Sequence, residues 1–297
     1  MRILGATEWR VAGVQLALVA CVLVFAGVPA TGQEWIFENV KEHYTVPRGV
    51  ACVPDCGDGT TALELARETE FLVLAMDTEP ANVAAARQKA AKAGLLGRRL
   101  YVEQGTVESI PFADNYVDLL IMPDVREAEL SPKVHDEVMR VLTPTRGRAI
   151  LADAVIEKPE LPGSDWWTHK LHGPNNNQVS EDTVFQFPPI LQFRAMPAFS
   201  SYVGSALTAH GVHVELNDWV YHDVQRAGLC GRIFARSVYN GRILWDAVLP
   251  EGIEANMPVC AIAGTDLLIS SGNRAVVLRR DLLTGNELPP VALDDGD

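Results

Sequence analysis

The feature that most constrains this chain is a pair of apolar runs that each end in an acidic residue. The first run ends at Asp55 and leads into a turn at 57–59, and the second run ends at Asp77. A helix-forming stretch lies between the turn and the second run. Glycines let backbone approach a ligand closely, and an acid after the second run can hydrogen-bond a ribose diol. This layout predicts a nucleotide-binding β-loop-α-β unit.

Two ligand classes share this layout. Dinucleotide enzymes use the pattern G-x-G-x-x-G/A, which Gly57, Gly59 and Ala62 fit. Proteins that use S-adenosylmethionine instead carry an acid two residues before the first glycine, where Asp55 stands. A carboxylate at this place suits the ammonium group of that cofactor and repels a pyrophosphate. The sequence therefore favours S-adenosylmethionine, and an NAD-dependent oxidoreductase is the weaker alternative.

Motifs between residues 40 and 156 resemble, in order and spacing, the class I S-adenosylmethionine-dependent methyltransferase family. Asp55, Gly57 and Gly59 match its first motif, and Asp77 matches its ribose-binding acid. The resemblance implies that these four residues bind the cofactor. It implies a fold more strongly than an activity, because one fold hosts many functions.

Further motifs extend the resemblance. Thr106 and Val107 stand where the family reads the adenine, although Thr106 replaces the usual acid. The segment 110–122, IPFADNYVDLLIM, is similar to the family's approach to its fourth strand, and 137–147, EVMRVLTPTRG, to its helix-to-strand turn. The methyl acceptor and the catalytic residues stay unknown. Asp124 is a candidate base, and a solvated loop acid is the simpler interpretation.

Strands and helices alternate over residues 33–157, which predicts an α/β domain with a Rossmann-like, doubly wound parallel sheet. Strands are expected at 50–53, 71–76, 100–103, 117–122 and 148–152. Helices are expected at 35–44, 60–68, 80–93 and 131–142. The family usually adds two more strands, the last one antiparallel. Here a proline-bearing linker at 158–164 follows instead, so the strands that carry much of the family's acceptor-binding wall are not expected.

Short β-type runs alternate with turn residues over 165–297, and this pattern predicts a mainly-β segment. Residues 235–245 and 279–289 align as an internal repeat, with Gly241 opposite Gly285. The spacing of the two copies is typical of the blades of a β-propeller.

Both copies resemble the A-x-D-x-x-T-G-x-x-x-W signature of quinoprotein (PQQ)-like propellers. The first copy keeps Trp245 but has Ser237 and Asn240 in place of Asp and Thr. The second keeps Asp281 and has Pro289 in place of Trp. A closed propeller needs about four to eight blades, so this segment is expected to be a partial propeller. An open sheet edge would invite a protein partner to pair with it.

The N-terminal segment 1–32 is typical of an export signal. Arg2 and Arg10 precede an apolar run at 11–28, and small residues follow. A retained membrane anchor is the alternative, and Leu18–Cys21 resembles a bacterial lipobox. Contact with a membrane is expected only if this segment is retained. The combination of modules resembles a bacterial family of large exported proteins, which implies a periplasmic or other extracytoplasmic location.

Several chemistries are disfavoured. The net charge of −13 argues against a nucleic-acid partner, which needs a basic face. Asp165, His169 and His172 can in principle ligate a metal, but they also fit the entry segment of a propeller, so no metal is expected. Export would permit disulfides, although small buried side chains are the simpler interpretation for Cys52, Cys56, Cys230 and Cys260.

Three functions of different class therefore remain open. The first is a methyltransferase that uses S-adenosylmethionine. The second is a non-catalytic exported scaffold whose modules bind partners. The third is an oxidoreductase that uses NAD. A titration with each cofactor separates them.

We expect the leader to be removed on export. Mass spectrometry of the protein from its native host should find an N-terminus near Thr31 or Gln33. An intact Met1 in the soluble cytoplasmic fraction would contradict this expectation.

Overall fold

A six-stranded sheet forms the first half of the computed structural model, which describes residues 32–44, 47–186, 188–189, 191–195, 206–217, 232–248, 260–270 and 276–292. The strands are β1 (Arg48–Val53), β2 (Glu70–Asp77), β3 (Leu100–Gln104), β4 (Leu119–Met122), β5 (Arg148–Leu151) and β6 (Val155–Glu157). Their order is β3-β2-β1-β4-β5-β6, with β1 to β5 parallel and β6 antiparallel. The order reverses between β1 and β4, where open α/β sheets bind ligands.

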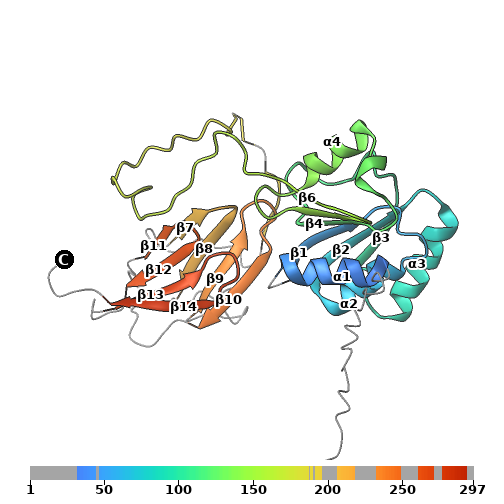
Figure 1. The fold of residues 1–297 in the computed structure, drawn as a ribbon, viewed down its shortest axis with the longest axis horizontal. Helices are drawn as coiled ribbons and strands as arrows, with labels where there is room; N and C mark the ends of the chain where they lie inside the picture. Colours follow the sequence, from blue (N-terminus) through green and yellow to red (C-terminus); the bar gives the residue numbers. More distant parts are fainter. Residues whose placement is uncertain are drawn as a thin grey trace, which may run out of the picture. The chain divides into compact units, whose positions relative to one another are not determined.

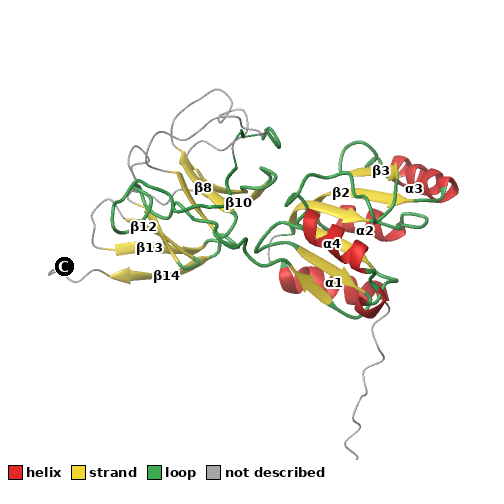
Figure 2. Ribbon diagram, turned by 90° about the horizontal axis from the view of Figure 1, so that it is seen from above, coloured by secondary structure: helices red, strands yellow, loops and turns green. Residues whose placement is uncertain are grey.

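Helices cover both faces of this sheet (Figure 1 and Figure 2). One face packs against α1 (Gly32–His43), α2 (Thr60–Glu68) and α3 (Pro80–Lys92), and the other against α4 (Pro132–Val141). A short 3-10 helix, η1 (Glu127–Glu129), precedes α4. In β1, Ala51 and Val53 face the three-helix side, whereas Cys52 faces the side of α4. Burial on both faces explains why the strands read as continuous apolar runs.

The predicted α/β fold is confirmed, and every strand and helix expected over 33–157 is present with its ends shifted by a few residues. The strand β6 was not expected. It folds back onto β5 through a tight turn, in which the Leu151 N–H donates to the Ala154 carbonyl (2.8 Å). A strand of three residues is too short to show periodicity, which is why sequence patterns miss it.

Two four-stranded antiparallel sheets make up the second half. The first contains β7 (Ala206–Ala209), β8 (Val212–Asn217), β9 (Arg232–Ser237) and β10 (Ile243–Val248). The second contains β11 (Cys260–Ala263), β12 (Asp266–Ser270), β13 (Val276–Asp281) and β14 (Glu287–Ala292). Each sheet is a meander, and the two share one apolar cluster. The expectation of a mainly-β second half is confirmed.

The two copies of the internal repeat form equivalent hairpins, β9–β10 and β13–β14. Gly241 and Gly285 occupy the turns with φ of 70° and 75°, and each glycine lies under an aromatic ring. A Cβ at Gly285 would lie 2.5 Å from Trp245, and one at Gly241 would lie 2.5 Å from Phe193. The Trp245 indole also donates to the Leu282 carbonyl (2.8 Å). Trp245 therefore joins the first sheet to the second.

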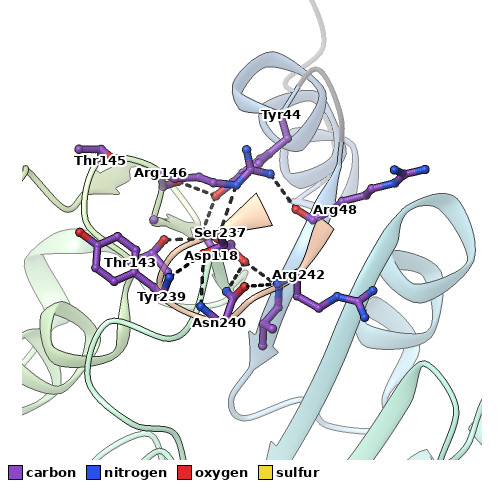
Figure 3. Close-up of polar contacts among 12 residues, drawn as sticks. Tyr44, Arg48, Asp118, Thr143, Thr145, Arg146, Ser237, Tyr239, Asn240 and Arg242 are labelled. Atoms are coloured by element: carbon purple, nitrogen blue, oxygen red, sulfur yellow. Dashed lines mark hydrogen bonds and ion pairs between the residues drawn. The ribbon is translucent and has the colours of Figure 1, made fainter. Parts of the chain in front are cut away.

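A buried carboxylate joins the first half to the second (Figure 3). Asp118, just before β4, is 0% exposed and accepts hydrogen bonds from the Val50 N–H and the Asn240 side-chain amide, each at 2.8 Å. Asn240 also donates to the Tyr116 carbonyl (2.9 Å), and Arg146 Nε lies 3.5 Å from Asp118 Oδ1. Burial raises the pKa of Asp118, and the Arg146 charge opposes that rise.

This contact explains why the first repeat departs from its signature. In the second repeat, Asp281 accepts the backbone N–H of Thr284 (2.7 Å) and so shapes the turn. In the first, the Ser237 hydroxyl accepts the N–H of Tyr239 (3.2 Å) and of Asn240 (3.4 Å). Ser237 thus takes over the turn-forming role, and the amide of Asn240 reaches the buried carboxylate instead.

Some expectations lie outside the described residues, namely the leader 1–32 except its last residue, and Cys230. In the described ranges, no helix is long and apolar enough to cross a bilayer. Residues 31–297 group into one compact unit, which contains the Asp118–Asn240 contact. The boundaries expected at 157 and 165 stay a prediction.

Replacing Asn240 by alanine removes a donor from the buried Asp118. We expect the free energy of unfolding to fall by about 1–3 kcal/mol, measured by urea denaturation. Thr284→Ala changes the equivalent turn position of the second repeat and should cost less than about 0.5 kcal/mol. Equal losses for the two variants would contradict the special role of Asn240.

Candidate functional site

The loops after β1, β2 and β3 meet at the carboxyl edge of the parallel sheet. The Gly57 N–H donates to the carboxylate of Asp77 (2.8 Å), and the Cys56 N–H donates to the Met76 carbonyl (2.8 Å). The Gly105 N–H, just before the third loop, donates to the Asp77 carbonyl (3.0 Å). The residues predicted to bind a cofactor are therefore brought to one place by backbone hydrogen bonds.

The two positions of the first loop require glycine for different structural reasons. Both adopt positive φ, 55° at Gly57 and 79° at Gly59. A Cβ at Gly59 would lie 2.6 Å from the Cβ of Ala86, so this glycine lets α2 begin against α3. No atom lies within 4 Å of a Cβ placed on Gly57. Only Gly57 therefore offers bare backbone to open space, which is what close approach by a ligand requires.

Asp77 is the centre of the site. It is 6% exposed, and one carboxylate oxygen accepts the Gly57 N–H. The other accepts the Glu79 N–H (2.9 Å) and the Asn82 side-chain amide (3.2 Å). Burial alone would raise the pKa of Asp77, but these donors hold it below its usual value. A carboxylate has about four acceptor positions, so roughly one is left for a ribose hydroxyl rather than two.

Asp55 adds a second carboxylate to this edge. The residue is exposed and adopts a left-handed backbone conformation, with φ of 52°. Partial burial, and then the negative charge of Asp77, raises the pKa of Asp55. Two carboxylates that repel each other gain from a positive charge between or beside them. The site is therefore suited to a cationic ligand.

Asp58 ties the first loop to two helices, a role that the sequence did not indicate. Its carboxylate accepts the Thr60 N–H (3.1 Å) and hydroxyl (2.6 Å), and Lys89 Nζ lies 2.5 Å away. Lys89 first, and then Thr60, lowers the pKa of Asp58 to about 2. An Asp before Gly-Thr is a recognisable turn signal, but the partner Lys89 on α3 is brought near only by the fold.

Thr106 and Val107 lie in the loop after β3. The Thr106 hydroxyl accepts the Glu108 N–H (3.3 Å), and Thr106 itself is exposed. Val107 is half-buried and packs against the core on the side of α4. Thr106 therefore stabilises its own turn and presents no charge to a ligand.

The two candidate histidines do not join this site. His172 Nε2 lies 2.7 Å from Asp165, and His169 Nδ1 lies 2.9 Å from the Thr168 hydroxyl. Among the described residues, no three His, Cys, Asp or Glu side chains are grouped so as to hold a metal. The described cysteines are free and buried, namely Cys52, Cys56 and Cys260. Asp124 is an exposed residue of the loop after β4.

A comparison with known families identifies the part of the chain that contains these loops. Residues 55–145 match the family described as "Methyltransferase domain". The matched range includes every residue predicted to bind the cofactor: Asp55, Gly57, Gly59, Asp77, Thr106 and Val107. The chain thus contains a methyltransferase-like domain of the kind that uses S-adenosylmethionine. No curated protein sequence matches the chain significantly.

Several solved structures are similar to about two fifths of the chain. One is a candidate S-adenosyl-L-methionine-dependent methyltransferase from Methanococcus maripaludis, with 24% identity over 41% of this chain and 54% of that one, at a TM-score of 0.36. Another is the YcgJ protein from Bacillus subtilis, with 25% identity over 39% and 48%, at 0.34. A third is geranyl diphosphate C-methyltransferase from Streptomyces coelicolor A3(2), with 15% identity over 38% and 43%, at 0.34. The chain spans about half the length of these structures.

The two loop glycines should respond differently to alanine. Gly59→Ala adds left-handed strain and a clash with Ala86, so the free energy of unfolding should fall by about 2–4 kcal/mol. Gly57→Ala adds only the strain and should cost about 1 kcal/mol. Denaturant titration of both variants tests this, and a larger loss for Gly57→Ala would contradict the assignment.

Proposed function

We propose that this chain binds S-adenosylmethionine at the carboxyl edge of its parallel sheet and transfers the methyl group to an acceptor. One observation carries the proposal: inside the range that matches a methyltransferase domain, the bare backbone of Gly57 donates a hydrogen bond to Asp77, and the charge of Asp77 acts on the carboxylate of Asp55, two residues before Gly57. Such a site attracts a cation, and S-adenosylmethionine carries an ammonium and a sulfonium group.

The described residues fit this cofactor. Asp55 would bind the ammonium group, and the open space beside Gly57 would admit the methionine portion. Asp77 would use its remaining acceptor position for a ribose hydroxyl, a charge-assisted hydrogen bond. When bound, the cofactor supplies a methyl group on a positively charged sulfur, which an electron-rich acceptor atom can attack.

Catalysis would rest on proximity and alignment. No catalytic residue is assigned, and Asp124 stays a candidate base because its loop follows β4 at the same edge of the sheet. The acceptor is unknown. Among the described residues, none after β6 adds a strand to this sheet, so we propose that the wall that selects the acceptor is formed by other parts of the chain.

The same site disfavours the oxidoreductase alternative. NAD carries a pyrophosphate, and two carboxylates beside Gly57 would repel it. The non-catalytic scaffold stays the main alternative, because Thr106 stands in place of the acidic residue that binds the adenine in the family. In that case the loop would keep its shape through Asp77 without binding a cofactor.

We also propose that the two antiparallel sheets are blades of a partial quinoprotein-like propeller in an exported protein. The equivalent hairpins and the packing of Trp245 on Gly285 support this interpretation. A protein partner is part of the proposal. Pairing along β14 is disfavoured, because Pro289 and Pro290 cannot donate to a neighbouring strand. A partner strand would therefore pair with another outer strand of the two sheets, namely β7, β10 or β11.

Calorimetric titration of the mature chain with S-adenosylmethionine tests the main proposal. Asp77→Ala should weaken binding by roughly ten- to a hundredfold, since it removes a charge-assisted hydrogen bond and the support of Gly57. Thr106→Asp should strengthen binding several-fold, because it supplies an acceptor for the adenine amine and can still accept the Glu108 N–H.

The result for Thr106→Asp separates the alternatives, because that variant leaves the loop contacts of Asp77 intact. No heat at millimolar S-adenosylmethionine for either the parent or Thr106→Asp, with folding shown by circular dichroism, would favour the scaffold. Binding of NAD in place of S-adenosylmethionine would favour the oxidoreductase.

A further inference from the structure

A second cavity lies outside the site described above. It has a volume of about 230 Å³ and is formed by the segment 161–185 together with the turn between β9 and β10. Three aromatic rings line it, from Trp166, Phe185 and Tyr239, and so do the carboxylates of Asp165 and Asp182. Its lining shares no residue with the loops at the carboxyl edge of the parallel sheet.

The aromatic rings are held by different means. The Trp166 indole donates to the Glu160 carboxylate, and its ring packs half-buried against the core of the two antiparallel sheets. Tyr239 is half-buried and directly precedes Asn240, whose amide is fixed by the buried Asp118. Phe185, in contrast, is 67% exposed at the cavity. Two rings are therefore positioned in advance, and the third is available to cover a bound group.

The two carboxylates are not equivalent. Asp165 is already well supplied with hydrogen-bond partners, because His172 Nε2 lies 2.7 Å away and the carboxylate accepts the Ser180 hydroxyl (2.9 Å) and the Glu181 N–H (2.7 Å). Asp182 uses one oxygen to accept the N–H groups of Val184 and Phe185, both at 2.8 Å. Its other oxygen has a single long contact, 3.4 Å from the Asp165 N–H. Asp182 therefore retains acceptor capacity and negative charge.

The charged residues that line the cavity, Asp165 and Asp182, are both acidic. Burial first, and then the charges of Glu160 and Asp182, raises the pKa of the Tyr239 phenol to about 12. His172 contacts the lining carboxylate of Asp165 through Nε2 (2.7 Å), and Lys158 points its ammonium to Asn115 and a carbonyl of α4. The whole chain has a net charge of −13. An anionic ligand is therefore disfavoured by charge repulsion.

We propose that this cavity binds a small organic cation, an alkylated ammonium group, between its aromatic rings and Asp182. Aromatic faces attract such cations, and quaternary ammonium groups are recognised in this way. A metal ion would need several oxygen ligands, whereas most of the lining is aromatic or aliphatic. The volume suits a group of side-chain size rather than a drug-sized molecule.

The same chemistry has two sources: a free quaternary amine, or the methylated lysine of a protein. The site is independent of the proposed methyl transfer, because it shares none of its residues. Failure of one proposal therefore leaves the other standing.

Calorimetry on the full chain tests the cation site with choline as the probe and with 3,3-dimethylbutan-1-ol as its uncharged isostere. We expect choline to bind and the alcohol to bind at least about tenfold more weakly, because the attraction needs the positive charge. A peptide containing trimethyllysine, compared with the unmodified peptide, shows whether a protein side chain is preferred to the free amine. Equal binding of choline and the alcohol would overturn the proposal. So would a result in which neither choline nor the methylated peptide binds.

Three variants locate the site. Asp182→Asn keeps an oxygen for the Val184 and Phe185 N–H groups but removes the charge, and should weaken binding about fivefold or more. Phe185→Ala removes an exposed ring and should weaken binding about two- to fivefold. Glu181→Gln is the matched control, because it removes an adjacent exposed charge that does not line the cavity. Equal effects of Asp182→Asn and Glu181→Gln would show that only the net charge of the protein affects binding, which would overturn the proposal.

Discussion

The buried carboxylate of Asp118 is the interaction on which the organisation of this protein depends. It lies just before β4 and binds backbone of β1 and the side chain of Asn240 from the second half of the chain. A buried carboxylate without donors would be costly. The turn that carries Asn240 therefore stabilises the α/β domain as well as its own sheet.

The opposite edge of the parallel sheet is organised by another carboxylate. Asp77 follows the same physical rule as Asp118, since burial is offset by donated hydrogen bonds, and its donors are the loop residue Gly57 and the first turn of α3. One side chain thus both shapes the loop and remains able to contact a ligand. Together with Asp55 it gives the site a negative charge, which links the fold to the proposed cationic cofactor.

The second half of the chain contributes more than a partner for Asp118. In its first repeat, Asn240 donates a hydrogen bond to the α/β domain, and the neighbouring Tyr239 lines the cavity proposed to bind an organic cation. A ligand there would contact the turn that joins the two halves. Ser237 makes this arrangement possible, because it shapes the turn and releases Asn240 from that role.

The sequence was enough to predict the α/β domain, because strands buried on both faces and helices with clear start and stop residues are local patterns. It also determined that Asp55, Gly57 and Asp77 belong to one edge, since parallel strands end together. The tertiary structure alone decided that Gly59 serves helix packing, that Lys89 binds Asp58, and that Asn240 reaches Asp118. Each of these contacts joins residues distant in sequence, and a contact of that kind leaves no periodic or spacing signal along the chain.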